Sequence, residues 1–160
     1  MGIPNSTSIH IDPRTKSHLR WDLTRIKKLL DSISGSIGNP SGTFPSAVDA
    51  GTPVYVSASD TLSPADASAL ATAQVVGLAN EDIGAGGTGE YVTHGRVTKA
   101  DWTSIIGAAA LTAGSVYYLS TTTGDLTTTA PTTVGEVVVR IGIALSTTTL
   151  NVNVEEPILL

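Results

Sequence analysis

Residues 137–154, V-V-V-R-I-G-I-A-L-S-T-T-T-L-N-V-N-V, carry the clearest indication of the fold class of this chain. Aliphatic side chains stand at every second position from Val137 to Leu145, and again from Leu150 to Val154. Such alternation is typical of β-strands that bury one face. The four residues 146–149 between the two runs predict a hairpin connection, so we expect antiparallel sheet here.

Weaker strand patterns precede this hairpin at residues 53–57, 74–79, 91–97 and 115–120. The first and last of them belong to matching octapeptides: A-G-T-P-V-Y-V-S at 50–57 and A-G-S-V-Y-Y-L-S at 113–120 share four of eight residues. Further on, V-G-L-A at 76–79 resembles I-G-I-A at 141–144. The order and spacing predict two similar halves, residues 50–98 and 113–155. Biased use of Ala, Gly, Val and Ser is the alternative explanation.

The composition also favours a mainly β fold. Charged residues make up 14% and aromatic residues 4% of the 160 residues, against about 25% charged residues in an average soluble domain. A core built from small and β-branched side chains suits pleated sheet. We therefore expect a small β-barrel or sandwich over residues 50–160. Residues 99–110 are expected to form a short helix that is capped by Thr98 or Asp101 and turns Trp102 and Ile106 toward the core. Residues 63–73 are expected to form another helical turn.

The N-terminal residues 1–36 differ from the rest. Residues 1–11 lack a helical period and predict an extended arm, whereas Asp12 and Pro13 form a favourable helix start. An amphipathic helix is expected to follow, with Gly35 as its stop. Its apolar seam consists of Leu19, Leu23, Ile26, Leu30 and Ile33. Residues 37–49 are rich in Gly and Pro and predict a linker.

A seam with steps of four and three residues buries itself against copies of itself or against the chain's own sheet. Six basic residues accompany it and form a candidate partner-binding face: Arg14, Lys16, Arg20, Arg25, Lys27 and Lys28. With three acids, they give residues 1–36 a charge of +3, whereas residues 37–160 hold three bases and eleven acids, which is −8. An acidic body repels a phosphate backbone, so we expect no nucleic-acid partner and a negatively charged protein surface instead.

The residues that would carry enzymatic chemistry are missing or badly spaced. The chain has no Cys, and its three His are scattered. In G-A-G-G-T-G, residues 84–89, the final Gly is followed by Glu90 and Tyr91, whereas a P-loop needs Lys and then Ser or Thr. A hairpin tip is the better interpretation. We expect no enzyme activity, cofactor or metal, and the absence of long apolar runs predicts no membrane span and no ordinary signal peptide.

Residues 50–160 resemble bacteriophage capsid decoration proteins, also called cement or head-fibre proteins. The resemblance is carried by A-G-T-P-V-Y-V-S, by V-V-G-L-A at 75–79, by A-D-W at 100–102 and above all by residues 111–160. This last segment contains L-T-A-G-S-V-Y-Y-L-S, G-D-L-T-T-T-A-P, V-V-V-R-I-G-I-A-L-S-T-T-T-L and a closing E-P-I-L-L. Residues 1–36 are not part of the pattern.

The resemblance implies a barrel-like homotrimer on the outer capsid surface of a virion, made in the cytoplasm of a bacterial host. It would clamp neighbouring major capsid proteins, and no residue would be catalytic. Related modules also end tail fibres, so the alternative is a fibre or adhesin module that binds a host-cell receptor through loops such as 84–89.

Overall fold

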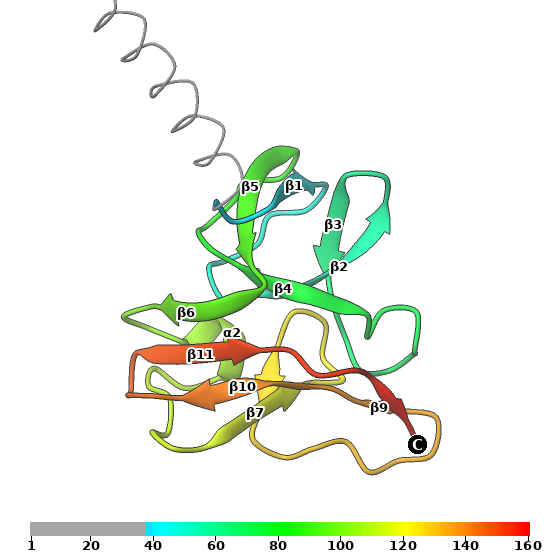
Figure 1. The fold of residues 1–160 in the computed structure, drawn as a ribbon, viewed down its shortest axis with the longest axis vertical. Helices are drawn as coiled ribbons and strands as arrows, with labels where there is room; N and C mark the ends of the chain where they lie inside the picture. The colour runs from blue at the N-terminus through cyan, green and yellow to red at the C-terminus, as the bar shows by residue number, and fades with distance from the viewer. Residues whose placement is uncertain (1–37) are drawn as a thin grey trace, which may run out of the picture. The chain divides into compact units, whose positions relative to one another are not determined.

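The computed structural model describes residues 38–160. They are mainly β and include a closed barrel, which confirms the expected fold class (Figure 1). The first half contains β1 (Ser41–Phe44), β2 (Pro53–Ala58), β3 (Thr61–Pro64), β4 (Val75–Ala79) and β5 (Gly87–Val92). The second half contains β6 (His94–Thr98), α2 (Thr103–Ile106), β7 (Val116–Leu119), β8 (Leu126–Thr127), β9 (Val137–Val138), β10 (Arg140–Ala144), β11 (Thr149–Asn153) and β12 (Ile158–Leu159).

The barrel has the strand order β1-β3-β2-β4-β5 and closes because β1 pairs on both of its sides. β1 runs antiparallel to β5, with Gly42 opposite Gly89, and its Thr43 lies opposite Thr61 of the parallel strand β3. Closure removes the free sheet edges that would otherwise need protection. Six buried side chains fill the interior: Phe44, Val48, Val54, Leu62, Ala79 and Ile83.

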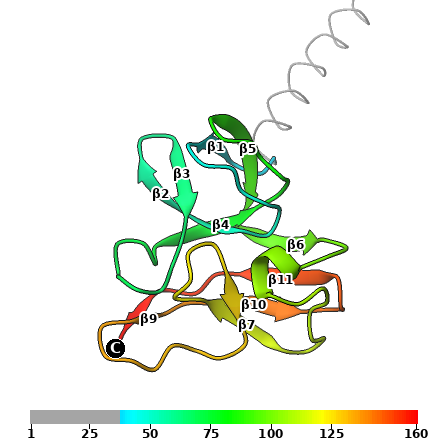
Figure 2. The ribbon, with the colours of Figure 1, turned by 180° about the vertical axis from the view of Figure 1, so that it is seen from behind.

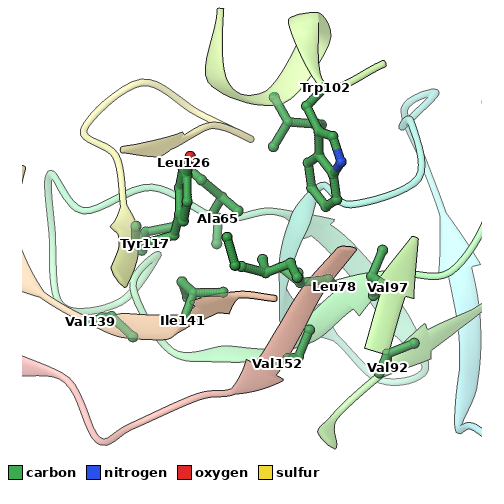
Figure 3. Close-up of a cluster of buried hydrophobic side chains, with 14 of the residues drawn as sticks. Ala65, Leu78, Val92, Val97, Trp102, Tyr117, Leu126, Val139, Ile141 and Val152 are labelled. Atoms are coloured by element: carbon green, nitrogen blue, oxygen red, sulfur yellow. The ribbon is translucent and has the colours of Figure 1, made fainter. Parts of the chain in front are cut away.

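The second half forms a five-stranded sheet in the order β6-β11-β10-β7-β8, and β9 and β12 pair as a separate ribbon. A second, larger core joins this sheet to the barrel. It takes Leu78 and Val92 from the barrel strands β4 and β5, and Ile141 and Val152 from β10 and β11 (Figure 3). The two halves of residues 39–160 therefore share one apolar core and form a single compact unit.

The two halves use the same strand pairing. In the first half, β2 carries the octapeptide and lies between its hairpin partner β3 and β4, which contains V-G-L-A. In the second half, β7 carries the octapeptide and lies between its hairpin partner β8 and β10, which contains I-G-I-A. Three cross-strand pairs of the first half have equivalents in the second: Val54–Gly77 matches Tyr117–Gly142, Tyr55–Val75 matches Tyr118–Arg140, and Val56–Leu62 matches Leu119–Leu126. In both halves the strand register shifts between the first two of these pairs.

The turns match as well. The Ala-Gly pairs place Gly51 and Gly114 at positive φ, 89° and 80°, where glycine is favoured. Their N–H groups donate hydrogen bonds of the same length, 2.8 Å, to the carbonyl oxygens of Ala79 and Ala144. This agrees with the expectation that Ala-Gly forms a turn that begins a strand.

The halves differ in how their sheets end. In the first half β1 joins β3 and closes the barrel, whereas within residues 38–160 no pairing joins β6 to β8, the corresponding strands of the second half. The chain instead forms α2, which packs against β8 (Figure 2). Trp102, just before α2, is fully buried and donates an Nε1–H hydrogen bond of 3.1 Å to the Thr148 carbonyl. The insertion around α2 therefore supplies core volume in the half whose sheet does not close by a pairing like that of β1 with β3.

The structure corrects several local expectations. Within the expected linker 37–49, residues Ser41–Phe44 form β1, and Phe44 is fully buried in the barrel. The β-rich unit therefore begins near Asn39. The helix expected over 99–110 is only the four residues of α2, and its N-cap is Trp102 rather than Thr98 or Asp101. Trp102 is buried as expected, whereas Ile105 is buried more fully than Ile106. Asp101 accepts a hydrogen bond from the Thr103 N–H just before the helix. Strand β3 and turns replace the helical turn expected over 63–73.

The alternation over 137–145 does not continue as one strand. Val137, Val139 and Ile141 are buried as expected, but Leu145 is 48% exposed, whereas Ala144 is buried. The register between β7 and β10 shifts between Arg140 and Gly142. A shift of this kind changes which side chains face the core. After the shift Ala144 faces the core, and Leu145 faces the solvent. Likewise, the strand expected over 91–97 is divided into β5 and β6.

Candidate functional site

All residues predicted for the seam and for the basic face lie in residues 1–37, outside the part that the structure describes. This holds for the seam residues Leu19, Leu23, Ile26, Leu30 and Ile33. It also holds for the basic residues Arg14, Lys16, Arg20, Arg25, Lys27 and Lys28. Their roles remain predictions, and the candidate surfaces below come from residues 38–160.

Asp66 is the most buried carboxylate among the described residues, with 9% exposure. Its Oδ1 accepts hydrogen bonds from the backbone N–H and the hydroxyl of Ser68 and from the Thr72 hydroxyl, and Thr123 donates to Oδ2 at 3.4 Å. Burial raises the pKa of Asp66, but these hydrogen bonds outweigh it and lower the pKa below its usual value. The carboxylate therefore ties the loop after β3 to the β7–β8 hairpin and acts as a structural group.

Residues 38–160 contain no group of three or more His, Asp or Glu side chains that could hold a metal ion. In the same part of the chain, every fully buried side-chain nitrogen or oxygen has a hydrogen-bond partner. No helix in this range is long and apolar enough to cross a membrane.

Loop 84–89, the expected hairpin tip, connects the antiparallel strands β4 and β5 and enters β5 at Gly87. Gly86 has φ of 75° and donates a hydrogen bond of 2.7 Å to the Phe44 carbonyl. The Gly87 N–H donates to the Gly84 carbonyl at 2.9 Å. These backbone contacts hold the tip against the end of β1.

A shallow acidic hollow of about 260 Å³ includes Asp49, Thr52, Ser104, Thr123 and Asp125 in its lining. Burial raises the pKa of Asp125. Lys99 lies nearby, with its Nζ 3.9 Å from an oxygen of Asp49 and 3.0 Å from the Ser104 hydroxyl. The hollow therefore holds one carboxylate beside a cation and one that receives no ion pair from a described residue.

A polar hollow of about 340 Å³ lies on the outer face of the five-stranded sheet, across β6, β10 and β11. Its polar lining residues are His94, Arg140, Asn151 and Asn153. Gly95, Gly142, Ile143 and Val152 complete the lining, so apolar groups share the hollow with hydrogen-bonding ones. The alternation over 150–154 predicted that Asn151 and Asn153 would lie on the face opposite the core. The alternation over 137–145 likewise placed Arg140 on the outer face. That Arg140 and His94 lie beside these Asn residues depends on strand order, which no local pattern predicts.

Four exposed aliphatic residues, called the aliphatic patch below, lie on the β9–β12 ribbon or next to it in the chain. Val134 is 87% exposed, and Ile158, Leu159 and Leu160 are 62%, 56% and 41% exposed. The Gly135 N–H donates to the Leu160 carbonyl at 3.0 Å, which brings the two segments together. Ile158 and Leu159 are neighbours on β12, so their side chains point to opposite faces of the ribbon. Single exposed aliphatic residues are ordinary, but several at one end of a domain form a candidate contact surface.

Neither a protein-family model nor a curated protein matches this chain.

Proposed function

We propose that this protein decorates and stabilises an icosahedral phage head by binding major capsid protein as a homotrimer. The structural observation that supports it best is the aliphatic patch of Val134, Ile158, Leu159 and Leu160 on a small β-module. The resemblance of residues 111–160 to decoration proteins supports it independently, and the patch includes the end of that segment. Many weak contacts repeated around a shell suit such a surface better than a deep pocket.

The N-terminal segment has two roles in this proposal. The seam of Leu19, Leu23, Ile26, Leu30 and Ile33 joins three copies, and the basic residues face a negatively charged capsid surface. Residues 1–36 carry a charge of +3 and the rest of the chain −8. A negatively charged capsid surface would repel the acidic part of the chain and attract the basic segment, which supports this division of roles.

Light scattering of the full chain at micromolar concentration tests the trimer. We expect three chains per particle and a loss of the trimer in the double variant Leu23→Lys, Leu30→Lys. Val56→Lys serves as the control, since Val56 is a 53% exposed aliphatic residue of β2. A monomeric wild-type protein would refute the trimer.

Head binding tests the decoration role. We expect the protein to sediment with heads that lack it, and cryo-electron microscopy of virions to place it on the capsid. Reversal of Arg20, Arg25, Lys27 and Lys28 to Glu should weaken head binding while the trimer persists, because the attraction depends on charge and is screened by salt. Unchanged binding at low salt would contradict this docking mode.

The second candidate is a fibre or adhesin module that binds a host-cell receptor. The polar hollow on the outer face of the five-stranded sheet favours it, because hydrogen-bonding side chains gather there in an open position. Immunogold labelling distinguishes the two candidates: label on fibre tips with bare heads supports the adhesin, and label on heads supports decoration.

A further inference from the structure

The polar hollow combines side chains from three adjacent strands. Asn151 and Asn153 come from β11, His94 from β6 and Arg140 from β10. Asn153 lies directly opposite His94 in the sheet register. A Cβ on Gly95 would meet no atom within 4 Å, so this corner of the hollow is open.

The hydrogen-bonding groups of this hollow are largely unused. The side chains of Asn151, Asn153 and His94 form no hydrogen bond with any described residue, and Arg140 uses its Nη1 for the ion pair with Glu155. An Asn amide offers an acceptor oxygen and two donor hydrogens, and a guanidinium offers five donors. The hollow thus presents donors and acceptors side by side on a rigid sheet.

Two of the three bases in residues 38–160, Arg96 and Arg140, are on the strands that form the hollow. Arg140 lines the hollow and is paired with Glu155, whereas Arg96 lies beside the lining residues. Arg96 lies opposite Asn151, is exposed and forms no ion pair with a described residue. Among the bases of residues 38–160, Lys99 and Arg140 are paired with acids, so Arg96 is the one left to attract an anionic group at the edge of the hollow.

An aromatic ring borders the same face. Tyr117 and Leu119 of β7 are buried, so the half-buried Tyr118 between them lies on the opposite, outer side of the sheet. Tyr118 is the register partner of Arg140. Its ring adds an apolar surface beside the hydrogen-bonding groups.

We propose that this hollow, the glycan site, binds a sugar that carries a carboxylate. Ring hydroxyls both donate and accept hydrogen bonds, as the amides of Asn151 and Asn153 do, and the carboxylate pairs with Arg96. The inference stands on the chemistry of the outer sheet face and does not require the head-decoration role.

Saturation-transfer NMR and calorimetry on the full chain test the glycan site. The probes are N-acetylneuraminic acid and galacturonic acid, with galactose as the neutral comparison. We expect the acidic sugars to bind and galactose to bind at least about tenfold more weakly, as one lost charge-assisted hydrogen bond predicts.

Two variants locate the site. Asn151→Ala with Asn153→Ala should weaken acidic-sugar binding about tenfold, because two hydrogen-bonding side chains are lost. Arg96→Gln, at an exposed position, should remove the preference for the acidic sugar without affecting folding. Asn80→Ala is the matched control at an exposed loop position outside the hollow.

The proposal is overturned if no sugar binds, if galactose binds as well as the acidic sugars, or if all variants bind like the wild type. A loss in the two glycan-site variants with retention in Asn80→Ala supports it. Circular dichroism and the melting temperature show whether the double Asn variant is folded. If that variant is unfolded, the sugar preference of Arg96→Gln alone tests the proposal.

Discussion

Gly142 of β10 packs directly on the backbone of Asn151 in the neighbouring strand β11, so closely that a Cβ atom on Gly142 would overlap the Asn151 carbonyl. The corresponding residue of the first half, Gly77, has the same relationship to Val92, whose carbonyl oxygen would lie 2.5 Å from an added Cβ. The small residue of V-G-L-A and I-G-I-A therefore permits the close strand approach that both halves share.

Gly142→Ala should be strongly destabilising. Backbone atoms oppose the added methyl group and cannot move as a side-chain end can, so we expect a loss of about 2–3 kcal/mol in the free energy of unfolding. Urea denaturation measures it. Gly84→Ala is the control, because a Cβ there meets no atom within 4 Å. Equal midpoints for the two variants would contradict the packing argument.

Asp60→Gly should stabilise the protein. Asp60 has φ of 52° and is the non-glycine residue at positive φ among residues 38–160, whereas the β7–β8 hairpin has Gly124, with φ of 83°, at the corresponding place. Relief of this strain is expected to add about 0.5–1 kcal/mol. The converse variant Gly124→Ala should lower stability by a similar amount. A lower melting temperature for Asp60→Gly would count against the correspondence of the two hairpins.

Trp102→Phe should destabilise the larger core. The change removes buried ring volume and leaves the Thr148 carbonyl without its 3.1 Å hydrogen bond from Nε1. We expect a cost of about 2 kcal/mol in thermal unfolding. Val56→Ala, at a residue 53% exposed, should change stability little. If both variants melt alike, Trp102 does not have the role assigned to it.

Asp125→Asn should stabilise the fold at neutral pH. Burial raises the pKa of Asp125 in the folded protein, so folding favours its protonated form. The charged form of Asp125 therefore lowers the stability of the fold. This loss of stability is complete above the raised folded pKa and is absent below the pKa of the unfolded chain. The gain from Asn should be present at pH 7 and vanish near pH 3, as measured by urea midpoints at both values. A gain that is independent of pH would exclude this explanation.

Asp66→Asn should destabilise the fold at neutral pH, in contrast to Asp125→Asn. The pKa of Asp66 is lowered in the folded state by hydrogen bonds from Ser68, Thr72 and Thr123, which overcome the effect of burial. The stabilisation by its charged form is therefore present above the unfolded pKa and lost as the pH falls through the folded pKa. Asp66→Asn should lower the urea midpoint at pH 7 and have a smaller effect at pH 3. A pH-independent loss would show that packing and not charge is responsible.

Local pattern was sufficient to predict much of the β-module. The alternation in 150–154 placed Leu150 and Val152 in the core, and the matching octapeptides became strands with equivalent partners. The hairpin connection expected at 146–149 spans residues 145–148, one position earlier. Strand alternation and turn chemistry depend on neighbouring residues, so they are readable along the chain. The polar face with Asn151 was predictable for the same reason.

The closure of the barrel and the contacts between distant side chains depend on the three-dimensional arrangement of the strands. The residue pattern was enough to predict a β-rich module with two similar halves. It predicted a linker at β1, because the strand character of β1 comes from pairing with β5 and β3, which lie far along the chain. The register shift at Gly142 likewise turned Leu145 outward against its local pattern. The glycan site joins three strands, and residues so distant in sequence become neighbours through strand order, which no local period encodes.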